Sequence, residues 1–217
     1  MKKKIALSVG GVLLAALLSY GGYSYIDSVR YVTTDDARID ADMIKVGPEI
    51  AGRVMEIRVK EGDLVQAGET MVRLEEKNTT LQNRDSALVR APGTGQVMKK
   101  MVNDGELVSP GQRLFLLADY KHLYVTARIE ETKINRITVG APVQLKVDAF
   151  PGKKLSGVVE QVGFAADSVF AVLPTSNVSG NFIKVTQRIP IKIKLLDDQG
   201  LRILPGMNVI AKIATEE

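Results

Sequence analysis

Two segments of the chain are near copies of one another, and this internal repeat restricts the fold more than any other feature. Residues 50–75, IAGRVMEIRVKEGDLVQAGETMVRLE, align without a gap to residues 93–118, GTGQVMKKMVNDGELVSPGQRLFLLA, at a constant offset of 43 positions. Two copies are too few for a solenoid, which needs about three units to bury its apolar faces. The repeat therefore predicts two halves of one β-sandwich, each covering the apolar face of the other.

Glycines recur at equivalent positions of the two copies. Each copy reads as strand, glycine turn, short strand, glycine turn and strand, because glycine permits the positive φ at which a chain reverses. The residues interpreted as structural turn glycines are Gly52, Gly62, Gly68, Gly95, Gly105 and Gly111. Only 5% of the residues are aromatic, so we expect Val, Ile and Leu to fill the interior.

The C-terminal part of the chain reads as antiparallel β-structure. PVQLKVDAF (142–150) and IPIKIKL (189–195) alternate apolar with polar side chains, the period of half-buried strands. Between the repeat and these strands, IEETKINRITVG (129–140) has the composition of a short helical turn that ends at Gly140.

The N-terminus carries a membrane signal. Residues 5–26 follow three lysines and contain no charged side chain, and as a helix they would cover about 30 Å of hydrocarbon. The lysines predict a cytoplasmic N-terminus and a bulk that is periplasmic or extracellular, anchored in the cell (inner) membrane. A cleaved signal peptide is the alternative, although the run exceeds the usual apolar region of such peptides.

Composition removes several classes of site. The chain has no Cys and one His, which excludes thiolate chemistry and Cys-ligated zinc and makes a His-based metal site unexpected. Three of its four excess positive charges belong to Lys2, Lys3 and Lys4, so no nucleic-acid footprint is indicated. Asp35 and Asp36 are interpreted as a solvated strand pair, and His122 receives no role. We therefore assign no catalytic, cofactor-binding or metal-binding residue and expect no enzyme.

The repeat resembles the biotinyl/lipoyl domain through EGDLVQAGETMVRLE (61–75) and RAPGTGQV (90–97). In carriers of that family the modified lysine lies on the tight turn between the halves. Lys77 is the only lysine in this junction and lacks the carrier motif, while VMKKM (97–101) aligns with a strand. A membrane-tethered carrier modified at Lys77 is one alternative function, and a ligand-binding module is another.

The whole chain resembles the HlyD/EmrA-type membrane fusion proteins more closely. YVTTDDARIDADMIKVGPEIAGRV (31–54) is similar to their N-terminal segment, and FAVLPTSNVSGNFIKVTQRIPIKIKL (170–195) to a segment of their β-barrel. The resemblance implies a mainly β chain with a transmembrane helix, a biotinyl/lipoyl-like sandwich and an antiparallel β-barrel. It also implies an oligomeric periplasmic adaptor of multidrug efflux, with a major-facilitator-type inner-membrane transporter as partner and a duct formed by the stacked adaptors.

The expected domains follow from these matches. They are a cytoplasmic tail (1–4), a transmembrane helix (5–26), a linker and first barrel strand (27–44), the sandwich (45–118), the barrel (119–214) and a tail (215–217). The halves of the sandwich are 45–75 and 91–118, joined by residues 76–90. These fifteen residues are far fewer than the helical hairpin that the family inserts there, so we do not expect them to reach an outer-membrane channel.

The segment between Phe170 and Phe182 is the candidate partner-contact loop. It is long for a hairpin loop and combines apolar with turn-forming residues, so it either folds onto the barrel or contacts a partner. The candidate contact residues are Phe170, Leu173, Pro174, Asn177, Gly180, Asn181 and Phe182.

Overall fold

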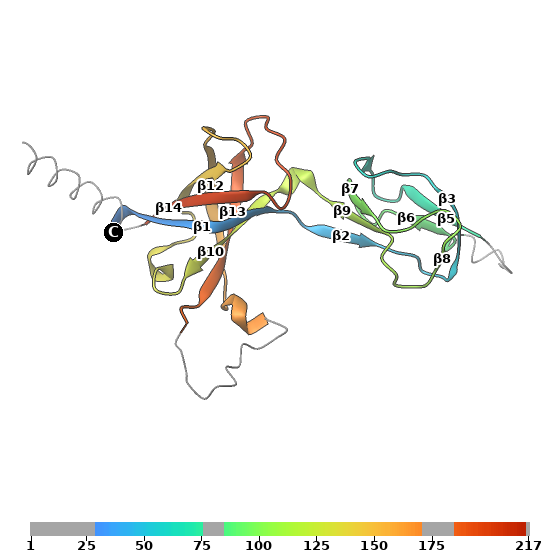
Figure 1. Ribbon diagram of the computed structural model, residues 1–217, viewed down its shortest axis with the longest axis horizontal. Coiled ribbons are helices and arrows are strands. Elements are labelled where there is room, and N and C mark those ends of the chain that lie inside the picture. The colour runs from blue at the N-terminus through green and yellow to red at the C-terminus, as the bar shows by residue number, and fades with distance from the viewer. Residues whose placement is uncertain (1–28, 76–84, 171–184, 216–217) are drawn as a thin grey trace, which may run out of the picture. The chain divides into compact units, whose positions relative to one another are not determined.

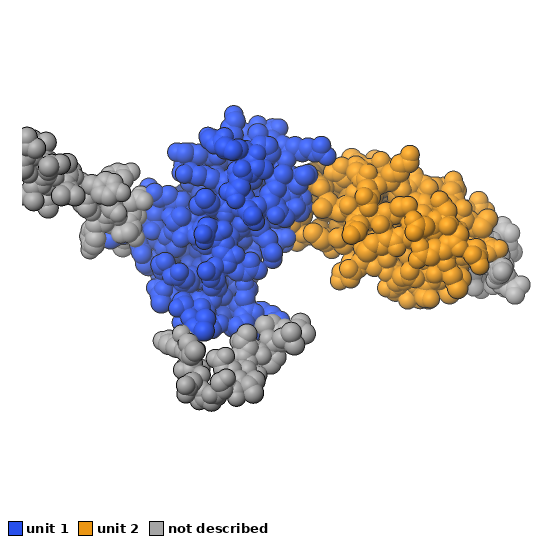
Figure 2. Space-filling model, viewed as in Figure 1, with its two compact units in different colours: residues 1–40, 124–217 blue, residues 41–123 orange. Residues whose placement is uncertain are grey.

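The computed structural model describes residues 29–75, 85–170 and 185–215 (Figure 1). The chain divides into two compact units, one of residues 1–40 and 124–217 and the other of residues 41–123 (Figure 2). Within the described ranges no helix is both long and apolar enough to span a bilayer. The apolar run of residues 5–26 lies outside those ranges.

Unit 1 is a closed antiparallel β-barrel. Its strands are β1 (Tyr31–Asp40), β10 (Tyr124–Glu130), β11 (Pro142–Val147), β12 (Leu155–Val162), β13 (Arg188–Asp197) and β14 (Asn208–Ala214). They neighbour one another in the order β1-β10-β13-β12-β11-β14, and β14 pairs back onto β1. The predicted β-barrel is confirmed, and the segment before the sandwich supplies one of its strands.

The period-2 pattern explains which side chains fill the barrel. Along β11 the residues Val143, Leu145 and Val147 are buried while the intervening side chains are exposed. Ile191 and Ile193 of β13 are buried in the same way. The predicted strands are therefore confirmed, and the predicted helical turn is a short 3₁₀-helix, η3 (Ile134–Arg136).

Strand β1 contains a break in its pairing that the pattern of apolar and polar residues did not reveal. Its pairing with β14 shifts register between Thr34 and Ala37. Val32 is buried before the shift, and Ala37 and Ile39 are buried after it, so the inward-facing positions change from even to odd numbers. The extra residue is a β-bulge at Asp35 and Asp36, which re-aims the side chains on either side of it.

Unit 2 consists of two four-stranded sheets. Its strands are β2 (Met43–Val46), β3 (Gly52–Ile57), β4 (Leu64–Val65), β5 (Thr70–Leu74), β6 (Leu88–Arg90), β7 (Gly95–Lys100), β8 (Leu107–Val108) and β9 (Phe115–Ala118). The sheets have the orders β2-β9-β7-β4 and β6-β5-β3-β8. Val, Leu, Ala and Met side chains form its buried core, in which Phe115 is the only ring among the described residues.

The two halves of the repeat exchange their short strands. Strand β4 of the first half pairs with β7 of the second, and β8 of the second half pairs with β3 of the first. Equivalent hydrogen bonds recur at the 43-residue offset: Gly62 N donates to Val97 O at 2.8 Å, and Gly105 N donates to Val54 O at 2.8 Å. Neither half can therefore complete its sheet alone.

The six repeat glycines fall into two groups. Gly62, Gly68, Gly105 and Gly111 have φ between 79° and 95° and lie in turns. The turn interpretation is wrong for Gly52 and Gly95, which begin strands β3 and β7. A Cβ on Gly95 would lie 2.9 Å from the carbonyl oxygen of Ala118, so this glycine permits close strand approach rather than a reversal.

Candidate partner-contact site

One end of the barrel gathers the features expected of a contact surface. Strands β10 and β12 end there, the 3₁₀-helix η4 (Asp167–Phe170) follows β12, and β13 begins there (Figure 1). Because β1 is antiparallel to both β10 and β14, β1 begins and β14 ends at this same end. We call it the η4 end.

Apolar side chains around η4 are strongly exposed. The side chain of Phe170 is 73% exposed, that of Val169 69%, that of Phe164 94% and that of Val185 66%. Phe170 is thus not packed on the barrel. The other candidate loop residues, namely Leu173, Pro174, Asn177, Gly180, Asn181 and Phe182, lie outside the described residues.

Sequence reasoning missed Phe164, Val169 and Val185. The sequence contained a signal for Phe164. The alternating pattern of β12 stops at Gly163, where the chain leaves the barrel wall, and Phe164 comes directly after this glycine. Gly163 N donates a hydrogen bond to Pro190 O at 2.8 Å, which keeps this exit against β13.

A four-residue ion network stabilises the same end. Arg128 of β10 binds Asp36 of β1, with Nη1 3.5 Å from Oδ1, and its Nε donates to Asp167 of η4. Arg188, the first residue of β13, donates to the second oxygen of Asp36. The interpretation of Asp36 as merely solvated is therefore wrong, because its carboxylate connects β1 to β10 and β13, the next two strands of the barrel wall. Asp35, its neighbour in the bulge, is exposed.

The bulge places these groups. Thr34 Oγ1 donates to the backbone oxygen of Arg128 at 2.9 Å and accepts from the backbone N–H of Asp36 at 3.2 Å. This second bond fixes the backbone at the irregular point, so that the carboxylate of Asp36 faces the two arginines. The side chains come from three strands and one short helix, which local sequence patterns do not bring together.

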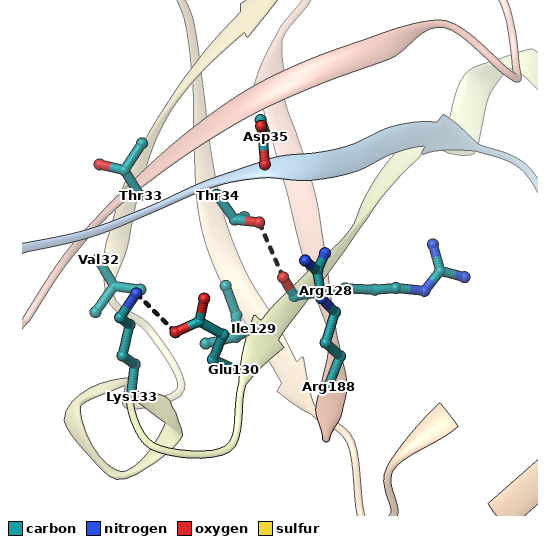
Figure 3. A pocket seen from close by; sticks show the side chains of 9 residues that line it. All are labelled: Val32, Thr33, Thr34, Asp35, Arg128, Ile129, Glu130, Lys133 and Arg188. Carbon is teal, nitrogen blue, oxygen red and sulfur yellow. Dashed lines mark hydrogen bonds and ion pairs between the residues drawn. The ribbon is translucent and has the colours of Figure 1, made fainter. Parts of the chain in front are cut away.

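A small pocket lies beside this network (Figure 3). Its volume is about 60 Å³, and its lining includes Thr34, Arg128, Glu130, Lys133 and Arg188. Lys133 Nζ lies 2.8 Å from Glu130 Oε2. This volume holds a few water molecules and is far below the roughly 300–1,000 Å³ of drug-sized ligand sites.

The ion pairs shift two pKa values. The hydrogen bond to Asp167 raises the pKa of Arg128 above its already high usual value, so this guanidinium stays charged at all physiological pH. The hydrogen bond from Lys133 lowers the pKa of the exposed Glu130 carboxyl. Because the Arg128 guanidinium keeps its charge, it suits a structural role better than proton transfer.

The remaining candidates of the sequence lie elsewhere. His122 Nδ1 lies 2.7 Å from Asp119 Oδ2, and this hydrogen bond lowers the pKa of the Asp119 carboxyl, which also caps η2 (Tyr120–His122). Lys99 and Lys100 lie in strand β7, as the repeat predicts. Lys77 lies outside the described residues. No group of three potential metal ligands is found in the described ranges.

Both units match known family models. Residues 42–119 match the barrel-sandwich hybrid domain of RND membrane fusion proteins, and residues 123–213 match the YknX-like β-barrel domain. Together these models cover all the described strands except β1 (Tyr31–Asp40), which precedes both matched ranges.

Similar proteins belong to efflux systems. The chain is 35% identical to the putative efflux system component YhbJ of Bacillus subtilis over 95% of this chain and 90% of that protein. It is 29% identical to the multidrug export protein EmrA of Escherichia coli over 85% of this chain, but it spans only 46% of that protein's length. The structure of the periplasmic adaptor protein EmrA has the same fold, with a TM-score of 0.54 and 16% identity over 87% of this chain and 99% of that chain.

Proposed function

The chain belongs to the HlyD/EmrA-type membrane fusion proteins, the adaptor components of efflux systems, and from this membership we propose that it is a membrane-anchored adaptor for an export transporter. Residues 5–26 anchor it in the cell membrane, with the N-terminus in the cytoplasm and both β units on the other side. The adaptor acts by contact and assembly and carries out no chemistry of its own.

The partner we propose is a major-facilitator-type transporter of the inner membrane. The similarity to EmrA and the resemblance of residues 170–195 to EmrA-type adaptors support this choice. Copies of the adaptor associate so that their sandwiches and barrels line a duct for the exported compound.

The observation that best supports Phe170 as a transporter-contact residue is its exposure. Phe170 is 73% exposed at a barrel end that the Asp36, Arg128 and Asp167 network holds in place. An exposed ring on a rigid support loses little conformational entropy on binding, which is the property of a contact residue. The candidate loop begins at this ring.

Co-purification tests this contact. We expect Phe170→Ser, alone or with Phe182→Ser, to reduce several-fold the amount of transporter recovered with the tagged adaptor, without lowering the yield of the adaptor. Leu196→Ser is the matched control, because Leu196 is 63% exposed on β13 and lies away from the η4 end. Equal recovery with Phe170→Ser and Leu196→Ser would show that the loop is not the transporter contact.

A further inference from the structure

The chain leaves little distance between the proposed anchor and the barrel. The apolar run ends at residue 26 and β1 begins at Tyr31. At 3.3–3.6 Å per residue, five residues span at most about 18 Å. If residues 5–26 cross the bilayer, as the proposed function requires, the η4 end of the barrel therefore lies close to the lipid headgroups.

Exposed apolar side chains of the barrel concentrate at this end. The exposed large apolar residues of unit 1 that lie at the η4 end are Val29, Tyr31, Val139, Phe164, Val169, Phe170 and Val185. Elsewhere in the described part of unit 1 only Leu196 and Ile210 are exposed to a comparable degree. Such a concentration is unusual for a surface that faces only water.

These side chains come from separate loops around the barrel rim. Val29 precedes β1 and Tyr31 is its first residue, Val139 lies between η3 and β11, and Phe164 and Val169 lie between β12 and β13. A protein partner usually covers one continuous patch, whereas a flat lipid surface meets all rim loops at once. The distribution thus favours a bilayer as the occupant of the rim outside Phe170, the residue that the proposed function assigns to the transporter.

The charges at this end are nearly balanced. Among the described residues, the basic side chains Arg30, Arg128, Lys133, Arg136, Arg188 and Lys212 exceed by only one the acidic side chains Asp35, Asp36, Glu130, Glu131 and Asp167. Attraction to anionic lipid therefore contributes little, and the burial of apolar side chains must drive any contact with lipid.

We propose that the η4 end of the barrel lies on the bilayer and that Phe164 and Val169 insert into its headgroup–acyl boundary. The barrel is then fixed against the membrane by its rim as well as by the anchor. This inference rests on the anchor of the proposed function but concerns lipid, and it does not require the transporter.

The absence of Cys from the chain allows a direct test with single labels. The full chain, carrying a fluorophore at Phe164→Cys or Val169→Cys, is reconstituted without transporter into phosphatidylcholine vesicles that contain a nitroxide-labelled lipid. Lys153→Cys is the control, because Lys153 is exposed in the turn between β11 and β12 at the opposite barrel end. We expect several-fold stronger quenching at positions 164 and 169 than at 153, and no loss of it at high salt.

The outcomes separate this inference from the proposed function. If quenching at 164 equals that at 153 while the chain resists alkaline extraction from the vesicles, the lipid contact is wrong and the anchor stands. Release of the chain by extraction would overturn the anchor and the lipid contact together. If the label at 164 becomes shielded only after transporter is added, the surface belongs to a protein partner and the lipid contact is again wrong.

Discussion

Arg128 connects three elements of the barrel through one side chain. Lying on β10, it binds Asp36 on β1 and Asp167 on η4, and its side chain is 25% exposed. Removing the guanidinium leaves the Asp167 carboxylate without this partner and weakens the support of η4. We expect Arg128→Met to destabilise the barrel by about 1 kcal/mol, as for a partly buried charged hydrogen bond. Faster hydrogen exchange in β10 and β13 would measure this loss.

The control for this substitution is Arg38→Met. Arg38 is 50% exposed and its Nε lies 3.9 Å from Asp40 Oδ2, so the pair is weak and solvated. We expect no measurable change in exchange. If both substitutions changed hydrogen exchange equally, the ion pairs of Arg128 would contribute no more to stability than the exposed Arg38 pair.

At the residue scale, the sequence predicted the backbone role of some positions but not the ion network. Gly62 and Gly105 lie in turns because each repeat copy reverses there, and this is a local signal. The sequence predicts a solvated Asp36 because consecutive side chains of a regular strand point to opposite faces, so that Asp35 and Asp36 cannot share a proton or a metal ion. The partners of Asp36, Arg128 and Arg188, are 92 and 152 residues away. Only the closure of the barrel brings them together.

Gly157 illustrates a constraint that acts through a whole strand. It lies buried in β12, between β11 and β13. A Cβ there would lie 2.8 Å from Ile193 Cγ2 and 2.9 Å from the backbone oxygen of Lys194. Because the second atom belongs to the backbone, β13 must shift to make room. We expect Gly157→Ala to destabilise the barrel by about 1–3 kcal/mol, measured as a lower thermal midpoint of the full chain in detergent.

Ser156→Ala is the control on the same strand, since Ser156 is exposed and its substitution should change stability by less than about 0.5 kcal/mol. An unchanged midpoint for Gly157→Ala would show that β12 and β13 separate easily, contrary to a closely packed barrel.

At the scale of single elements, the alternation of apolar and polar residues is sufficient to predict a strand where that strand is regular. Strands β11 and β13 were recognised because buried and exposed positions alternate along much of their length. Alternation did not reveal the irregularity of β1, whose inward face changes at the bulge near Asp35. A bulge reverses the phase of the pattern, so a segment with an apolar residue at 32 and others at 37 and 39 does not show one period.

At the scale of the whole molecule, the repeat predicted a sandwich of two halves but not the exchange of short strands between them. The 43-residue offset shows that the halves are alike, and this requires only local comparison. That β4 pairs with β7 and β8 with β3 depends on contacts between the halves, about which neither copy alone carries information. The exchange also places two equivalent leucines on different sheets.

Leu64 on β4 and Leu107 on β8 are the pair in question. Their side chains are 71% and 70% exposed, each at the edge of its sheet. If adaptors assemble head to tail into a ring, the Leu64 edge of one copy meets the Leu107 edge of the next. We expect Leu64→Asp or Leu107→Asp alone to abolish the ring, because every interface between identical variant copies then contains one altered edge. Mass photometry of the full chain in detergent measures the distribution of assemblies.

Mixing the two single variants gives the sharper result. A Leu64→Asp copy retains an intact Leu107 edge, and a Leu107→Asp copy retains an intact Leu64 edge. One interface can therefore form between them and no second one can follow, so the mixture should contain dimers and nothing larger. Gln66→Asp, an added charge at an exposed position just after β4, should leave the ring intact. Wild-type assemblies from either single variant would place the contact between copies elsewhere than on these two edges.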